Sequence, residues 1–163
     1  MNTTVVLIAV FGIGFLCGLR SFAPLALVSW MAVWGWTPVA GSPFWFIGKN
    51  AFAIAISILA VLELIGDKLP KTPARTALMP LIGRFVTGGI AAAAMSFSAG
   101  RPWFHGLLLG PIGAMIGAFA GYHARRSLVR SLRVPDLIVA LVEDFVTIGG
   151  TLFLVHNFFH TPV

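Results

Sequence analysis

The sequence predicts an all-α, polytopic membrane protein with about six membrane segments. Three observations predict this fold class: 58% of the 163 residues are hydrophobic, 10% are charged, and the mean hydropathy is +0.96. A soluble domain carries about 25% charged residues, and a soluble chain of this length leaves roughly a third of its unfolded-chain surface in water. One buried core cannot hold this much apolar surface, so we expect neither a soluble enzyme nor a nucleic-acid-binding protein.

Clusters of Pro, Gly or charged residues divide the chain into six apolar segments. The segments cover residues 4–19, 22–36, 51–66, 77–97, 103–122 and 137–158. A helix rises about 1.5 Å per residue and the hydrocarbon layer is about 30 Å thick, so one span needs about 20 residues. The last three segments are long enough. We therefore expect a single integral membrane domain over residues 1–163.

The first two segments are short and need a different explanation. One helix over residues 4–36 would be about 50 Å long, which is well beyond one bilayer. Gly18, Arg20 and Pro24 mark the point where such a helix should break. We expect either a hairpin or a broken helix here. A hairpin that crosses twice puts both termini outside, whereas a broken helix that crosses once puts the N-terminus inside.

The loop charges predict the orientation. The loops 68–75 and 125–133 are strongly basic, whereas the loops that contain Lys49 and Arg101 carry one charge each. Lys and Arg in short loops stay on the cytoplasmic side. We therefore expect a multi-pass membrane protein with both basic loops in the cytoplasm. All five tryptophans fall on the predicted outer side, where their amphipathic rings favour the membrane interface; they are Trp30, Trp34, Trp36, Trp45 and Trp103.

A weak internal repeat suggests two related halves, 1–75 and 76–163. At an offset of 80 to 82 positions, Gly18, Arg20 and Glu63 have counterparts in Gly100, Arg101 and Glu143. Three segments in each half would run antiparallel, and such 3+3 inverted repeats build transporter folds with binding sites at the midplane. A rival register matches residues 14 and 18 with residues 117 and 121, at an offset of 103. Both registers stay open.

Glycines recur every three or four residues in the fifth segment. They are Gly106, Gly110, Gly113, Gly117 and Gly121. This spacing puts a smooth stripe along one helix face, where another backbone can approach closely. The stripe predicts helix packing, either within the chain or as the seam of a homodimer, which is the oligomer that we expect. The alternative is the bare wall of a pore or substrate groove.

Four carboxylates lie within or at the ends of membrane segments. Glu143 and Asp144 are six or seven residues into the last segment, and Glu63 and Asp67 share one face near the end of the third. An ionisable group at bilayer depth costs several kcal/mol and is normally kept for pairing or function. These four side chains are therefore our candidates for cation or proton sites.

Two arginines, Arg20 and Arg84, are the counter-charges. In a structural reading, Arg84 pairs with Glu143 or Glu63, and Arg20 pairs with Asp144 or with carbonyls at a helix end. In a functional reading, one carboxylate, preferably Glu143, titrates or binds a cation along a pathway. The arginines then set the local field or engage an anionic group.

Metal and nucleophile motifs are weak. His156 and His160 are spaced i, i+4 and could share a metal, but no third ligand is close in sequence. Cys17 is typical of an apolar core residue. The sequence has no Ser-His-Asp spacing, zinc motif or phosphate loop. We therefore expect no cofactor, and we favour a protein that is not an enzyme. The enzymatic alternative would act on a lipid head group and use the four carboxylates named above as general acid or base.

Several motifs together resemble a known family. They are the stretch at residues 18–24, the stretch at residues 63–70, His123 with Arg130, and the pair Glu143-Asp144. In this combination the chain resembles the bacterial membrane family described as domain of unknown function 4126. The stretch around Arg84 matches more loosely, because similar sequences place a proline directly after that arginine. The resemblance implies a compact multispanning protein of unassigned activity, which we expect in the bacterial inner (cytoplasmic) membrane.

These observations together favour a small helical transporter or channel for a small ion or solute. Buried carboxylates, a broken first pair of segments and the internal repeat motivate this hypothesis. The alternative is a non-transporting membrane protein that interacts with lipids or partner helices and uses its charges only as internal salt bridges.

Overall fold

The computed structural model describes residues 2–67, 78–132 and 135–159, and these residues form helices joined by short loops. The elements in chain order are α1 (Thr3–Leu19), α2 (Ala23–Val33), the short 3-10 helix η1 (Trp45–Gly48), α3 (Asn50–Gly66), α4 (Leu78–Ser98), α5 (Trp103–Leu132) and α6 (Asp136–Phe158). The predicted all-α class is confirmed, and each predicted segment corresponds to one helix.

Three of the helices are long and apolar enough to cross a membrane. They are α4, α5 and α6, whereas α1, α2 and α3 are apolar but have 17 residues or fewer. This composition is typical of an integral membrane protein. That all six helices cross the bilayer, and that the two halves are an inverted repeat, stay predictions.

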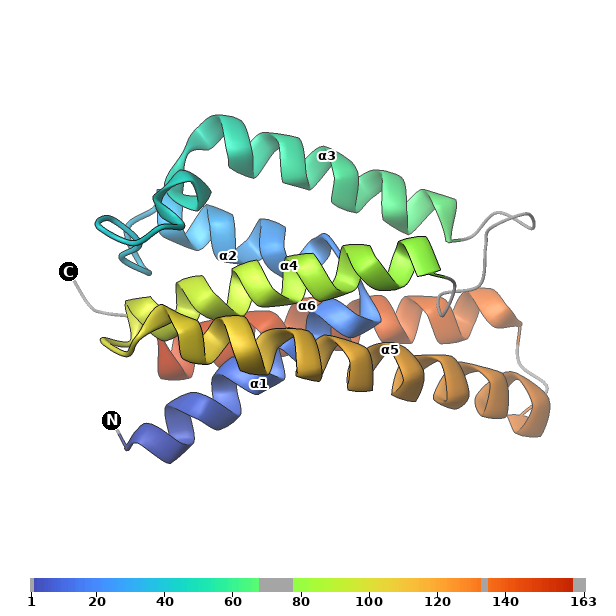
Figure 1. Ribbon diagram of the computed structural model, residues 1–163. Coiled ribbons are helices and arrows are strands. Elements are labelled where there is room, and N and C mark those ends of the chain that lie inside the picture. The colour runs from blue at the N-terminus through green and yellow to red at the C-terminus, as the bar shows by residue number, and fades with distance from the viewer. Residues whose placement is uncertain (1, 68–77, 133–134, 160–163) are drawn as a thin grey trace.

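The first two segments are separate helices. Leu19 ends α1, and Arg20 is extended at φ −137° and ψ 122°. Pro24 lies in the first turn of α2, where its missing N–H costs nothing. Figure 1 shows α2 running back from the break, so α1 and α2 form a hairpin, and the start of α1 lies at the same end of the bundle as the end of α6.

Helix α5 packs closely against both α1 and α4. A Cβ atom on Gly106 would lie 2.1 Å from the carbonyl oxygen of Ala92 in α4, and one on Gly117 would lie 2.1 Å from that of Phe15 in α1. These distances leave no room for a side chain, so the backbones are in direct contact. The α5 glycines at 110, 113 and 121 also face these two helices.

The glycine stripe is therefore covered within one chain. A homodimer stays a prediction, but α1 and α4 occupy the face that we expected it to use. A second copy could reach this face only by displacing one of these two helices, so a dimer would need another surface.

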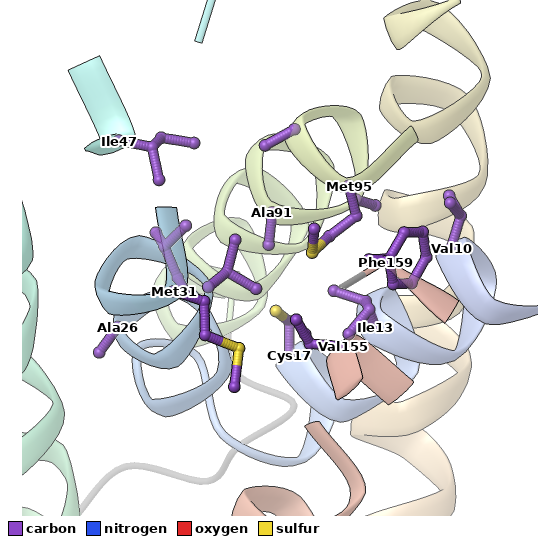
Figure 2. Close-up of a cluster of buried hydrophobic side chains, with 14 of the residues drawn as sticks. Val10, Ile13, Cys17, Ala26, Met31, Ile47, Ala91, Met95, Val155 and Phe159 are labelled. Atoms are coloured by element: carbon purple, nitrogen blue, oxygen red, sulfur yellow. The ribbon is translucent and has the colours of Figure 1, made fainter. Parts of the chain in front are cut away.

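The buried apolar core lies where α1, α2, α4 and α6 meet. Figure 2 shows Ile13 and Cys17 of α1, Met31 of α2, Met95 of α4 and Val155 of α6 pointing toward one another. The thiol of Cys17 has no exposed surface. The prediction that Cys17 is a core residue is therefore confirmed.

The two ends of the bundle differ in chemistry. At the end where α2 and α4 finish, Trp30 and Trp34 have ring centroids 5.9 Å apart, and Phe44 and Trp103 have centroids 6.0 Å apart. At the opposite end, α5 extends ten residues beyond the predicted segment (Figure 1), and Arg126 on this extension is exposed. The predicted basic loop 68–75 lies outside the described residues, so the orientation stays a prediction.

Candidate functional site

Arg20 lies at the break between α1 and α2, and its side chain has no exposed surface. Its Nη1 pairs with Oδ2 of Asp67, the residue that caps the C-terminus of α3. Its Nη2 lies 2.6 Å from Oδ1 of Asp144 in α6. One guanidinium therefore joins the break to two other helices, and the pairing of Arg20 with Asp144 is one that the sequence suggested.

Glu63 of α3 binds the backbone at the same break. Its Oε1 accepts a hydrogen bond from the N–H of Ser21 at 2.8 Å, and its Oε2 accepts one from the N–H of Phe22 at 3.0 Å. Phe22 is the N-cap of α2 and supplies no capping side chain of its own. Because the first amides of a helix lack partners and carry positive partial charge, a carboxylate there is stabilising. Helix α3 thus supplies the cap of α2.

Arg125 of α5 forms an outer layer over these contacts. Its Nε lies 2.7 Å from Oδ1 of Asp136, and its Nη2 pairs with the other oxygen of that carboxylate. Its Nη1 lies 3.9 Å from Oδ2 of Asp67 and 3.9 Å from Oε2 of Glu143. The Oδ2 atom of Asp67 therefore lies between the two arginines, one buried and one partly exposed.

Glu143 lies between α5 and α6. A Cβ atom on Gly121 would lie 3.0 Å from Oε1 of Glu143, so the smallest residue of α5 leaves space for this side chain. The hydroxyl of Thr147 donates to the carbonyl oxygen of Glu143 at 2.8 Å, within the turn that carries Glu143 and Asp144. Gly121 thus has a role beside the carboxylate as well as in helix packing.

Arg84 is buried in α4, with 2% of its surface exposed. A Cβ atom on Gly88 of α4 would lie 3.5 Å from Cβ of Cys17 in α1, and these two helices run in opposite directions (Figure 1). Arg84 is one helical turn before Gly88, and Ser21 is four residues after Cys17. Arg84 and Ser21 are therefore at a similar depth in the bundle. The predicted pair between Arg84 and Glu143 stays a prediction.

We call seven connected side chains the charge cluster. They are Arg20, Glu63, Asp67, Arg125, Asp136, Glu143 and Asp144. The chain has only five acidic residues, and all five are in this cluster. Among the described residues, Arg20 and Arg125 are cations that pair with this group of carboxylates.

Two members of the charge cluster, Arg125 and Asp136, were not among our predicted site residues. The sequence assigned Arg125 to a topology-determining basic loop and made no use of Asp136. The signal that could have found them is their spacing: Arg125 lies in the last third of α5, and Asp136 begins the next helix eleven positions later.

The cluster does not have the geometry of a metal centre. In residues 2–67, 78–132 and 135–159, no group of three or more His, Cys, Asp or Glu side chains is arranged to hold a metal ion. His156 is exposed near the end of α6, and His160 lies outside the described residues. The contacts that the structure gives these carboxylates are ion pairs and hydrogen bonds.

The fold and the site define a helical membrane protein with a buried ionic cluster at a helix break. The model of the family described as domain of unknown function (DUF4126) matches residues 7–159, so the chain belongs to this family. No curated protein and no solved structure shows a significant match to the chain. The family description names no activity, so the function has to be argued from the charge cluster.

Proposed function

We propose that the protein is a small transporter or channel that moves a small ion or solute and uses the charge cluster as a proton or cation site. The single observation that carries this proposal is the gathering of all five acidic residues around a helix break. Broken helices whose ends face a group of charges are a common way to build ion sites in transporters.

The gathering of carboxylates supports a role for a mobile cation. A carboxylate at this depth is costly when charged and is normally kept for pairing or function. Binding of a proton or a monovalent cation at one of them would change the pairing within the cluster. Glu143 and Asp144 are neighbours on α6, so one bound cation near Glu143 would act on both.

The position of the cluster supports a pathway that opens toward the basic end. Gly121, beside Glu143, is 18 residues after Trp103, which corresponds to about 27 Å along α5 from the aromatic end. The exposed Arg126 and Arg130 lie beyond it. With the basic end in the cytoplasm of a bacterium, as we propose, the cluster would lie close to the cytoplasmic interface of the inner membrane.

The test is flux into proteoliposomes that contain the purified chain. We expect Glu143→Gln to abolish proton or cation flux while the protein remains folded, because the amide has nearly the same shape and cannot carry the charge. Asp136→Asn is the matched control, since it removes one negative charge at the exposed edge of the same cluster. Unchanged flux in a folded Glu143→Gln protein would reject the proposal.

One observation favours a second candidate function, a non-transporting membrane protein in which the cluster only holds the helices together. Arg20 is fully buried and paired with two carboxylates, which is the arrangement of a structural lock. Under this alternative the native protein shows no flux of any ion in the same proteoliposomes, and its charges contribute only to stability.

A further inference from the structure

The break between α1 and α2 is built to hold an anion. It presents two backbone N–H groups, those of Ser21 and Phe22, and both point at the same carboxylate. The guanidinium of Arg20, the adjacent residue, adds a fully buried positive charge. A helix N-terminus with a neighbouring arginine is a common anion site, and here the anion that fills it is the side chain of Glu63.

Arg20 has donor capacity left at this place. Its Nε–H is buried and has no hydrogen-bond acceptor among the described residues. A buried N–H without an acceptor costs free energy, so it points to an acceptor that the folded chain does not itself provide. A small anion beside Ser21 and Phe22 would be within the reach of this side chain.

Helix α3, which carries Glu63, is the least buried of the six helices. Only Ala53, Ile56 and Ala60 of its 17 residues are buried. It packs mainly on α2 and η1, and it lies at the edge of the bundle in Figure 1. Regions with few buried contacts are those that move most readily, but the pair of Asp67 with Arg20 ties the end of α3 to the break. Glu63 can therefore leave the two amides by rotation of its own side chain, while that pair stays in place.

We propose that a small monovalent anion with two or more oxygen atoms on one face, such as a carboxylate or nitrate, displaces Glu63 from the amides of Ser21 and Phe22. This inference rests on the proposed function and names its substrate class. The anion accepts the two amide hydrogen bonds and the N–H of Arg20, and the side chain of Glu63 rotates away while Asp67 stays paired with Arg20.

The charge balance then requires a proton. An added anion would bring one more negative charge among these carboxylates, which is costly at this depth. If the displaced Glu63 carboxylate binds a proton from the solution, one negative charge enters and one is neutralised. The charged or titratable groups around it are Arg20 and Cys17 from α1 and the break, Asp67 from α3, Arg84 from α4, Arg125 from α5, and Asp136, Glu143 and Asp144 from α6. The anion and the proton would therefore move together.

The binding test uses the purified full chain in detergent. We would measure the midpoint of thermal unfolding against rising formate, nitrate or chloride, with gluconate as a bulky carboxylate that keeps the ionic strength constant. In the native protein, formate and nitrate should raise the midpoint in a saturable manner. In Glu63→Ala, whose internal competitor is missing, saturation should occur at an anion concentration about tenfold lower, because a ligand that binds only the folded state stabilises it.

Two further variants keep the binding test decisive. If Glu63→Ala does not fold, Glu63→Gln replaces it in the test, because an uncharged side-chain amide binds the N–H groups of Ser21 and Phe22 more weakly than the carboxylate does. The double variant Glu63→Gln with Arg20→Gln should lose the saturable response, because the positive charge is gone. No anion-specific shift in either the native protein or the Glu63 variants would overturn the proposal, since a cap that is only structural would never exchange with formate.

The transport test separates this inference from the proposed function. In proteoliposomes, an inward gradient of nitrate should drive proton uptake, and a gluconate gradient should not. Proton flux that is independent of the anion would overturn the anion site and leave the proposed function in place. Saturable anion binding in a chain that shows no flux of any kind would support the site and reject transport.

Discussion

Arg20 Nη2 lies 2.6 Å from Asp144 Oδ1, and the same guanidinium also pairs with Asp67. Arg20 follows the last residue of α1, so this contact fixes a chain break against the middle of α6. A buried charge of this kind is tolerated only while its partners stay in place. The stability of the break should therefore depend on both members of the pair.

Removal of either partner should destabilise the protein strongly. We expect Arg20→Gln and Asp144→Asn each to lower the free energy of unfolding by about 3–5 kcal/mol, because each leaves a buried charge without its counter-charge. The double variant should lose less than the sum of the two single losses. Reversible unfolding of the purified protein in detergent measures this cycle. Additive losses would show that the pair contributes nothing as a pair.

An aspartate at the edge of the cluster should behave differently. Asp136 begins the same helix and also pairs with an arginine, Arg125, but its side chain is 59% exposed, against 12% for Asp144. Exposed ion pairs contribute about 0–1 kcal/mol. We therefore expect Asp136→Asn to cost less than about 1 kcal/mol in the same unfolding measurement. If Asp136→Asn lowered the free energy of unfolding as much as Asp144→Asn, the buried and the exposed ion pairs of the cluster would contribute equally, contrary to this prediction.

The glycine stripe gives a prediction with a control in the same protein. A Cβ atom on Gly117 would lie 2.1 Å from the carbonyl oxygen of Phe15, whereas one on Gly149, inside α6, would meet no atom within 4 Å. Gly117→Ala should therefore destabilise the protein by about 1–3 kcal/mol through overpacking. Gly149→Ala should be neutral or stabilising by up to about 1 kcal/mol, since alanine favours the helix. Equal tolerance of both substitutions would argue against close packing of α1 on α5.

The sequence predicted helices better than it predicted contacts. Apolar runs and helix breakers place each segment within a few residues, except that α5 continues past residue 122 to Leu132 through polar residues that still form helix. Hydrophobicity alone does not indicate where a polar helix end extends beyond the bilayer. The break at Arg20 followed from local rules, namely helix length and the effect of proline.

The charge cluster was only partly predictable, because its members are far apart in the chain. Spacing showed that Glu63 and Asp67 share a helix face, but it could not show that Glu63 caps α2 across 42 positions. Arg125 was interpreted as a loop charge because its partner, Asp136, is on another helix. Pairings between helices depend on which faces meet, and that information lies in the packing rather than in local periodicity.

The orientation of the bundle is open to direct test with the protein's single cysteine removed. Ala40 is exposed in the loop at the aromatic end, and Ser127 is exposed on the basic extension of α5. In a Cys17→Ala background, we expect a membrane-impermeant maleimide to label Ala40→Cys on intact cells and Ser127→Cys only after the membrane is opened. Tryptophan-rich interfaces occur on both sides of a membrane, but short basic segments stay in the cytoplasm. Labelling of Ser127→Cys on intact cells would invert the orientation and move the charge cluster to the outer interface.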